Sequence, residues 1–110
     1  MENTTYETFA KLDIRIGTIK SVEIVEDADK LLKLMVDVGE EEPRQIISGI
    51  RTHFEDPQSL VGKQCPFVIN LEPRTIRGLE SRGMILATSS DNVFGLLTPE
   101  VEISAGSMVK

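Results

Sequence analysis

Hydrophobic and polar residues alternate in several short runs along the chain, which is the pattern of half-buried β-strands. The clearest run spans residues 31–38 and carries Lys33 on one face. The other face of this run is wholly apolar and consists of Leu32, Leu34, Val36 and Val38. We therefore predict a strand over 31–38 that turns this apolar face towards a core.

The run over 13–25 also alternates, but its phase changes part-way along. Ile14 and Ile16 are in step, whereas Ile19 falls on the other face. Because side chains alternate faces along a strand, this slip predicts a bulge or a sharp bend, and we expect Gly17 to be the pivot. A long first strand that bends to serve two edges is expected of a small closed barrel.

The remaining pattern completes an all-β architecture. Further apolar runs, separated by turns rich in Gly and Pro, cover 44–50, 65–71, 84–87, 93–97 and 101–109. Helical signals are short: Asn3–Thr5 can cap a helix, and we expect Phe9 and Leu12 to seal one end of the core. We predict a single domain over 1–110, built as a closed barrel of about five strands with short helices and a C-terminal extension.

One stretch of unusual composition joins the apolar runs 67–71 and 84–87. It combines three arginines with turn-forming residues, namely Arg74, Arg77, Arg82, Pro73, Gly78 and Gly83. Because proline cannot donate to a ladder, strand pairing should stop at Pro73. Hydrogen-bond donors gathered on a loop that a rigid scaffold holds are a common form of binding site. The stretch is therefore interpreted as a cationic binding loop, with an ordinary solvated connection as the alternative.

The distribution of charge refines this interpretation. The net charge of −6 opposes binding to polyanions in general. All of this negative excess lies in residues 1–42, because residues 43–110 carry as many Lys and Arg as Asp and Glu. Within 63–82 there are four cations and two acids. Since phosphate binding needs local cations, a basic patch on an acidic molecule indicates selective binding of nucleic acid with modest affinity.

The reactive side chains are too few for most kinds of catalysis. The chain has one cysteine and one histidine, so it offers neither a disulfide nor a zinc-binding spacing. Cys65 lies in an apolar run and is interpreted as a buried thiol, and no phosphate-binding G-x-x-x-x-G-K-[ST] motif occurs. No run approaches about 18 apolar residues. We expect a non-catalytic cytoplasmic binding module with no metal, no cofactor and no membrane association.

An ordered set of motifs makes the chain recognisable. In chain order the motifs are Lys11–Gly17, Asp27–Leu31, Ile46–Ile50, Leu60–Lys63, Asn70-Leu71-x-Pro73-Arg74, Arg77-Gly78 and Ser81-x-Gly83-Met84. No single motif is decisive, but together they cover almost the whole chain. The set resembles the tRNA-binding OB-fold domain that occurs at the C-terminus of many methionyl-tRNA synthetases and in free-standing tRNA-binding proteins.

The resemblance implies an OB barrel that binds tRNA, acting as a homodimer through its C-terminal extension or beside a methionyl-tRNA synthetase. With Arg82 added for its charge, the residues expected to bind RNA are Lys33, Asn70, Arg74, Arg77, Ser81, Arg82 and Met84. Arginine forks suit phosphates and base edges, and Asn and Ser suit 2′-hydroxyls. Two alternatives stay open: a protein-binding secretion chaperone of the same fold, and a synthetase-docking subunit with weak RNA contact.

Overall fold

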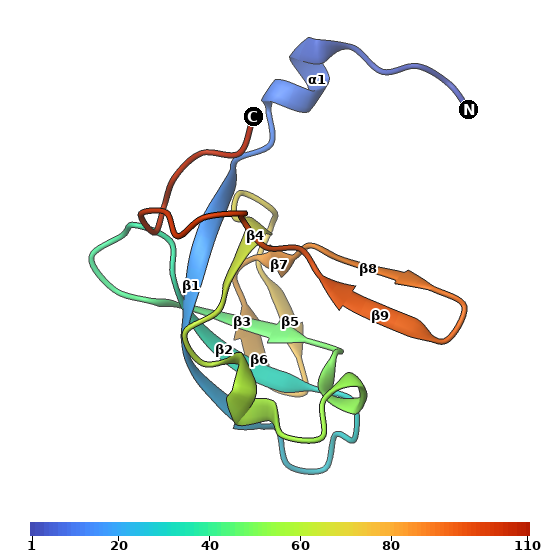
Figure 1. The fold of residues 1–110 in the computed structure, drawn as a ribbon, viewed down its shortest axis with the longest axis vertical. Helices are drawn as coiled ribbons and strands as arrows, with labels where there is room; N and C mark the ends of the chain where they lie inside the picture. The colour runs from blue at the N-terminus through green and yellow to red at the C-terminus, as the bar shows by residue number, and fades with distance from the viewer.

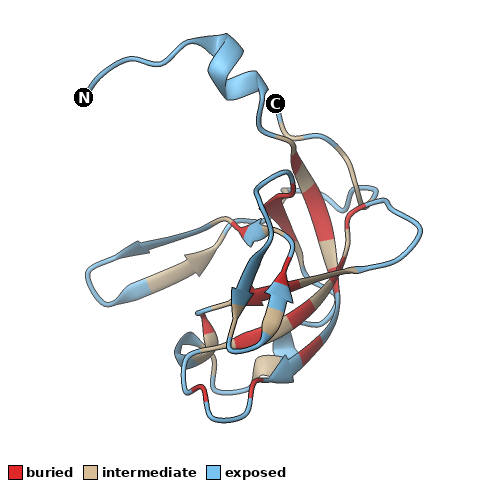
Figure 2. Cartoon of the chain, turned by 180° about the vertical axis from the view of Figure 1, so that it is seen from behind, coloured by how far each residue is buried: buried red, intermediate tan, exposed pale blue.

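The prediction that alternating strands build a core is confirmed. In the computed structural model, which describes residues 1–110, the apolar face of the run 31–38 is fully buried. These side chains belong to a cluster of 13 buried residues whose largest member is Phe67. Figure 2 shows the buried positions concentrated in the barrel strands, while the N-terminal segment is exposed and the projecting hairpins are largely exposed or intermediate.

The chain is almost entirely β-structure. Its elements are α1 (Tyr6–Ala10), β1 (Ile14–Ile24), β2 (Leu32–Asp37), β3 (Arg44–Ser48), the 3-10 helices η1 (Arg51–His53) and η2 (Pro57–Leu60), β4 (Gln64–Val68), β5 (Arg74–Ile76), β6 (Leu79–Ser81), β7 (Met84–Ile85), β8 (Ala87–Ser90) and β9 (Val93–Leu96) (Figure 1). Five strands form one antiparallel sheet in the order β3-β2-β1-β4-β7. Next to β7, the N–H of Arg82 donates to the carbonyl of Gln45 at 2.9 Å and nearly closes the barrel. The predicted five-stranded OB barrel is confirmed.

The long first strand does bend and pair along two edges, but the bend is not where the sequence suggested. The first half of β1 pairs with β4, and the second half pairs with β2. The register shifts between Ile19 and Ser21, so the bulge lies after Gly17 and not at it. Packing instead explains the glycine at position 17, because a Cβ there would lie 2.5 Å from Val36 Cγ1 and 2.7 Å from Phe67 Cδ1.

The N-terminal helix stands away from the barrel (Figures 1 and 2). Its start is as expected, because the Thr5 hydroxyl caps it by accepting from the Thr8 N–H at 3.1 Å. However, the helix buries no residue, and Phe9 and Leu12 are 43% and 41% exposed. The expectation that these two side chains seal the core is wrong. The core is already closed by strand residues, so the helix has no partner within the chain.

The C-terminal extension runs beside the first half of β1. The Gly106 N–H donates to the Ile16 carbonyl at 2.7 Å, and the Ile16 N–H donates to the Ser107 carbonyl at 2.8 Å. The run 101–109 is therefore not the regular strand that its apolar residues suggested: only an isolated bridge at Met108 has strand geometry. Preceding it, the hairpin of β8 and β9 projects from the barrel (Figure 1). No helix has the length and apolar character required to cross a membrane.

Candidate nucleic-acid interface

The cationic stretch folds into a small hairpin that the sequence pattern did not reveal. β5 and β6 have three residues each and pair with Ile76 opposite Leu79. Only Arg77 and Gly78 connect them, with φ values of +52° and +79°. Positive φ at both central residues is the requirement of a type I′ turn. The signal in the sequence was the Arg-Gly pair, but strands this short have no readable alternation.

Arg77 occupies a backbone conformation that its side chain does not favour. Residues other than glycine adopt φ near +50° uncommonly, and Asn and Asp are the usual exceptions. The preferred sequence for this turn would be Asn-Gly or Asp-Gly. An arginine at the tip of an exposed hairpin, in a conformation that disfavours it, makes Arg77 a candidate functional residue.

The three predicted arginines of the hairpin region are unpaired. Arg74, Arg77 and Arg82 are exposed. The ion pairs of the structure join Arg15 with Asp13, Lys33 with Glu23, and Arg44 with Glu40, so none of them involves these three guanidinium groups. Each can therefore offer its planar set of donors to an external phosphate or base edge.

Ser81, in contrast, is buried and bonded within the protein. Its side chain belongs to a residue only 5% exposed, and its hydroxyl accepts from the Ile47 N–H at 3.0 Å. The same hydroxyl donates to the Gly83 carbonyl at 3.2 Å. A second link is made by the Gln45 amide, which donates to the Glu80 carbonyl at 2.9 Å. The structure thus places Ser81 where it fixes the hairpin against β3.

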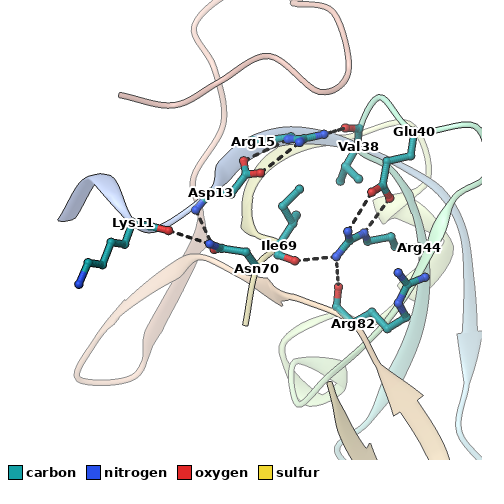
Figure 3. A network of polar contacts seen from close by, with 9 residues as sticks. All are labelled: Lys11, Asp13, Arg15, Val38, Glu40, Arg44, Ile69, Asn70 and Arg82. Atoms are coloured by element: carbon teal, nitrogen blue, oxygen red, sulfur yellow. Dashed lines mark hydrogen bonds and ion pairs between the residues drawn. The ribbon is translucent and has the colours of Figure 1, made fainter. Parts of the chain in front are cut away.

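Asn70 also makes its contacts inside the protein. Its Oδ1 accepts from the Asp13 N–H at 2.7 Å, and its Nδ2 donates to the Lys11 carbonyl at 2.7 Å (Figure 3). The side chain therefore ties the segment before β1 to the chain that leaves β4. Asn70, like Ser81, supports the shape of the candidate interface from behind.

Arg44 is a residue that the sequence reasoning missed. From β3 its Nη1 donates to the Ile69 carbonyl at 2.6 Å and to the Arg82 carbonyl at 3.1 Å (Figure 3). These carbonyls lie at the two ends of the stretch 69–82, so one guanidinium holds together both ends of the cationic loop. The Glu40 carboxylate receives two further bonds from Arg44, at 2.7 and 2.8 Å. No sequence motif could have shown this clamp, because its members come from three separate segments, namely 40–44, Ile69 and Arg82.

Electrostatics reinforces the clamp. The hydrogen bond from Arg44 is the main cause that lowers the pKa of Glu40, and the bond to Glu40 raises the pKa of Arg44. The Arg44 side chain is only 14% exposed. Both groups are therefore held in their charged forms, and the charge of Arg44 is neutralised within the protein instead of being offered to a ligand.

The other predicted site residues fall in two places. Lys33 lies on the outer face of β2, where its Nζ pairs with the Glu23 carboxylate at 2.9 Å. Met84 begins β7 and is 46% exposed. Together with Arg74 and Ser81, Met84 lines a hollow of about 70 Å³ beneath the hairpin. The structure therefore brings Arg74, Ser81 and Met84 together around one hollow. Lys33 does not line this hollow, but it lies opposite Ile47 of β3, whose N–H bonds to Ser81.

Lys30 is a second residue that the sequence reasoning left without a role. It is exposed on the connection between β1 and β2. A hollow of about 340 Å³ is lined by both this connection, from Ala28 to Leu31, and Arg77 at the hairpin tip. Two cations that are far apart in the sequence thus border one surface depression. OB barrels commonly bind ligands on one sheet face and the loops around it.

The buried thiol has no part in this surface. Cys65 is buried, as the sequence suggested, and burial raises its pKa to about 11. A thiol with that pKa stays protonated at neutral pH and is a poor nucleophile. Its role is to fill space in the core beside Phe67.

Comparison with known proteins agrees with this architecture. A family model described as "Putative tRNA binding domain" matches residues 14–108. A methionine–tRNA ligase of Methanococcoides burtonii is 49% identical over 107 residues, which is 96% of this chain and 15% of the ligase. The chain thus spans about a sixth of the length of the curated relatives that it matches.

Solved structures give two further similarities. The crystal structure of a MetRS-related protein from Pyrococcus horikoshii matches with a TM-score of 0.91 and 33% identity, over 100% of both chains. The chaperone CsaA from Bacillus anthracis matches with a TM-score of 0.88 and 27% identity, over 99% of this chain and 100% of that one. Since the family model covers nearly the whole barrel and its extension, the chain belongs to the family of tRNA-binding domains related to the C-terminal region of methionine–tRNA ligases.

Proposed function

We propose that this chain binds folded tRNA through the hairpin β5–β6 and the connection that carries Lys30. The observation that carries the proposal is Arg77, which is kept at the hairpin tip in a conformation better suited to Asn or Gly. Its guanidinium has no partner in the protein and shares a hollow with Lys30. Membership of the tRNA-binding family supports the choice of ligand.

In this proposal the residues divide into those that contact RNA and those that position them. Arg74, Arg77 and Arg82, with Lys30, contact phosphates, because their cations are exposed and unpaired. The side chains that hold the loop are Arg44, Asn70 and Ser81. Lys33 is paired with Glu23 in the free protein, so it contacts RNA only if a phosphate displaces that carboxylate.

The proposed mode of RNA recognition takes account of the small number of aromatic residues. The chain has no tryptophan, one tyrosine and four phenylalanines, which argues against a broad aromatic platform on which many successive bases could stack. Cations placed on two loops can instead match the spacing of phosphates in a folded RNA. We therefore propose recognition of tRNA shape, with similar affinity for many tRNAs, and weak attraction for other polyanions because the net charge is −6.

The relatives suggest where such a domain works. Their catalytic parts lie outside the 15% that this chain matches in the ligase of Methanococcoides burtonii. We propose that the chain itself carries out no catalysis and supplies tRNA affinity to a methionine–tRNA ligase. The exposed apolar side chains of Tyr6, Val93 and Val101, which are 79%, 73% and 66% exposed, support association into a homodimer. Light scattering at micromolar concentration measures that state directly, and a monomer contradicts it.

Binding to bulk tRNA, measured beside single-stranded and duplex RNA of equal length, tests the proposed function. The proposal predicts tighter binding to tRNA than to either control, and binding that weakens as salt rises. Equal binding to all three RNAs contradicts shape recognition. The second candidate is a protein-binding role, which the similarity to the chaperone CsaA favours. Suppression of the aggregation of an unfolded protein, with no binding to tRNA, would support it.

A further inference from the structure

A small hollow beneath the hairpin combines apolar and polar groups. Its volume is about 70 Å³, and its lining includes Leu71, Glu72, Arg74, Ile76, Ser81 and Met84. Leu71 and Met84 are 41% and 46% exposed, although both belong to a domain with a well-formed core. These two apolar side chains therefore face solvent at the mouth of a hollow that sits among the candidate RNA-binding residues.

The contents of the hollow restrict what it can bind. The Ser81 hydroxyl is already bonded to Ile47 and Gly83, and every buried side-chain nitrogen or oxygen in the structure has a partner. The hollow therefore contains no unpaired buried polar group that a bound water would have to satisfy. A phosphate is also a poor fit, because Leu71 and Met84 are apolar and the Glu72 carboxylate repels anions. The lining suits a flat, largely apolar group with hydrogen-bonding atoms at its edge.

We propose that this hollow receives the edge of one unstacked nucleobase of the bound RNA, a proposal that rests on the tRNA-binding function. The base enters edge first and contacts Leu71 and Met84. Arg74, on the same rim, binds the phosphate of that nucleotide or an acceptor on the base, while Glu72 accepts from an exocyclic amino group. A paired base cannot enter, because its edge and both its faces are already in use.

The hollow is formed before RNA arrives. Gly83 borders it with φ at +153°, and a Cβ there would lie 3.0 Å from Ile46 Cδ1 and 3.1 Å from the Val68 carbonyl. This close approach brings the chain down onto the barrel between Ser81 and Met84. The bond from Arg44 to the Arg82 carbonyl fixes the same point from the side. A preformed site costs little ordering on binding, so a single base contact can add selectivity for RNAs that expose a base.

The test uses an RNA hairpin with one bulged 2-aminopurine, the same hairpin with an abasic bulge, and a fully paired version. For the wild-type protein we expect the abasic hairpin to bind about fivefold more weakly than the bulged one, since one apolar contact is lost. Met84→Ala should weaken binding to the bulged hairpin by a similar factor and leave the abasic one unchanged. Met108→Ala, which truncates another exposed methionine, should change neither. The 2-aminopurine fluorescence should change on binding, and less so with Met84→Ala.

Several outcomes would overturn the base site. Equal affinity of the wild-type protein for the bulged and abasic hairpins would do so, as would a Met84→Ala effect of the same size on both. A loss of binding to an apolar peptide in Met84→Ala, with RNA binding unaffected, would reassign the hollow to a protein ligand. If salt-dependent tRNA binding persists in these cases, the proposed function stands without the base site. If no RNA binds at all, both proposals fail.

Discussion

The hydroxyl of Ser81 accepts a hydrogen bond at 3.0 Å from the backbone N–H of Ile47, which lies in β3. It thereby supplies the acceptor that a neighbouring strand would otherwise provide at this edge of the sheet. Because Ser81 is buried, water cannot replace the hydroxyl. The link joins the edge of the barrel to the hairpin that carries Arg74 and Arg77, so we expect barrel stability and RNA binding to depend on the same bond.

Ser81→Ala should therefore destabilise the fold as well as weaken tRNA binding. Leaving a buried N–H without an acceptor costs about 1–3 kcal/mol. Urea unfolding should show this loss as a lower midpoint with an unchanged slope. Ser90→Ala, at an exposed serine of β8, is the control and should change the free energy of unfolding by less than about 0.5 kcal/mol. If the two variants are equally stable, the hydroxyl does not hold the hairpin.

The clamp between Glu40 and Arg44 should make stability depend on acid. The hydrogen bond from Arg44 lowers the pKa of Glu40 below its ordinary value of 4.5. A carboxyl whose pKa is lower in the folded state contributes stability above its unfolded pKa, and this contribution is lost as the pH falls through the folded pKa. We expect wild-type stability to fall more steeply than that of Glu40→Gln below about pH 4.5. Parallel curves of melting temperature against pH for the two proteins would contradict this.

Gly17→Ala should destabilise the barrel because the new methyl group has no space. It would lie 2.5 Å from Val36 Cγ1 and 2.7 Å from Phe67 Cδ1. Overpacking of this kind costs about 1–3 kcal/mol. Gly49→Ala is the matched control, because a Cβ there meets nothing nearer than the Lys30 carbonyl at 4.0 Å. Thermal unfolding of both variants distinguishes this packing explanation from the original idea that Gly17 is a pivot, in which no clash is expected.

Lys30 and Arg77 should act on tRNA together. Both border the hollow of about 340 Å³, so in the proposed interface they bind one phosphate or two adjacent ones. Lys30→Gln should weaken tRNA binding and reduce the salt slope by about one unit. Combined with Arg77→Asn, its effect should be non-additive by at least about 0.5 kcal/mol, because the two cations share a ligand group. Strict additivity in this double-mutant cycle would separate Lys30 from the site of Arg77.

The sequence predicted those features of the fold that neighbouring residues determine, and it missed those that depend on distant segments. The strand over 31–38 and the five-stranded barrel could be predicted because alternation and turn residues are local signals. The position of the bulge and the exposure of Phe9 could not, because they depend on which surfaces other segments have already covered. Patterns along the chain show which residues favour burial, but not whether another segment of the fold covers them.

The candidate site shows the same division. Arg74, Arg77 and Arg82 were predicted from charge on a turn-rich loop, and the structure places them exposed and unpaired. Asn70 and Ser81 were predicted from family motifs, which mark positions without separating contact from support. Their side chains bond to Asp13 and Ile47. We infer that these two residues affect RNA binding through the placement of the loop.

The most direct test of the account is Arg77→Asn. Asn-Gly is a favoured pair for a type I′ turn, so this change removes the cation while relieving the strained backbone at φ +52°. The melting temperature should stay the same or rise. Binding to tRNA should weaken, and the slope of log affinity against log salt should become shallower by about one unit. Lys20→Asn, which removes an exposed cation near the bulge of β1, is the control for net charge.

The decisive quantity is therefore tRNA affinity as a function of salt for wild type, Arg77→Asn and Lys20→Asn, measured by fluorescence anisotropy. The account predicts that Arg77→Asn alone loses affinity and about one unit of slope while its melting temperature is maintained. Wild-type affinity and slope in Arg77→Asn, or an equal loss in Lys20→Asn, would contradict the claim that the hairpin tip binds tRNA.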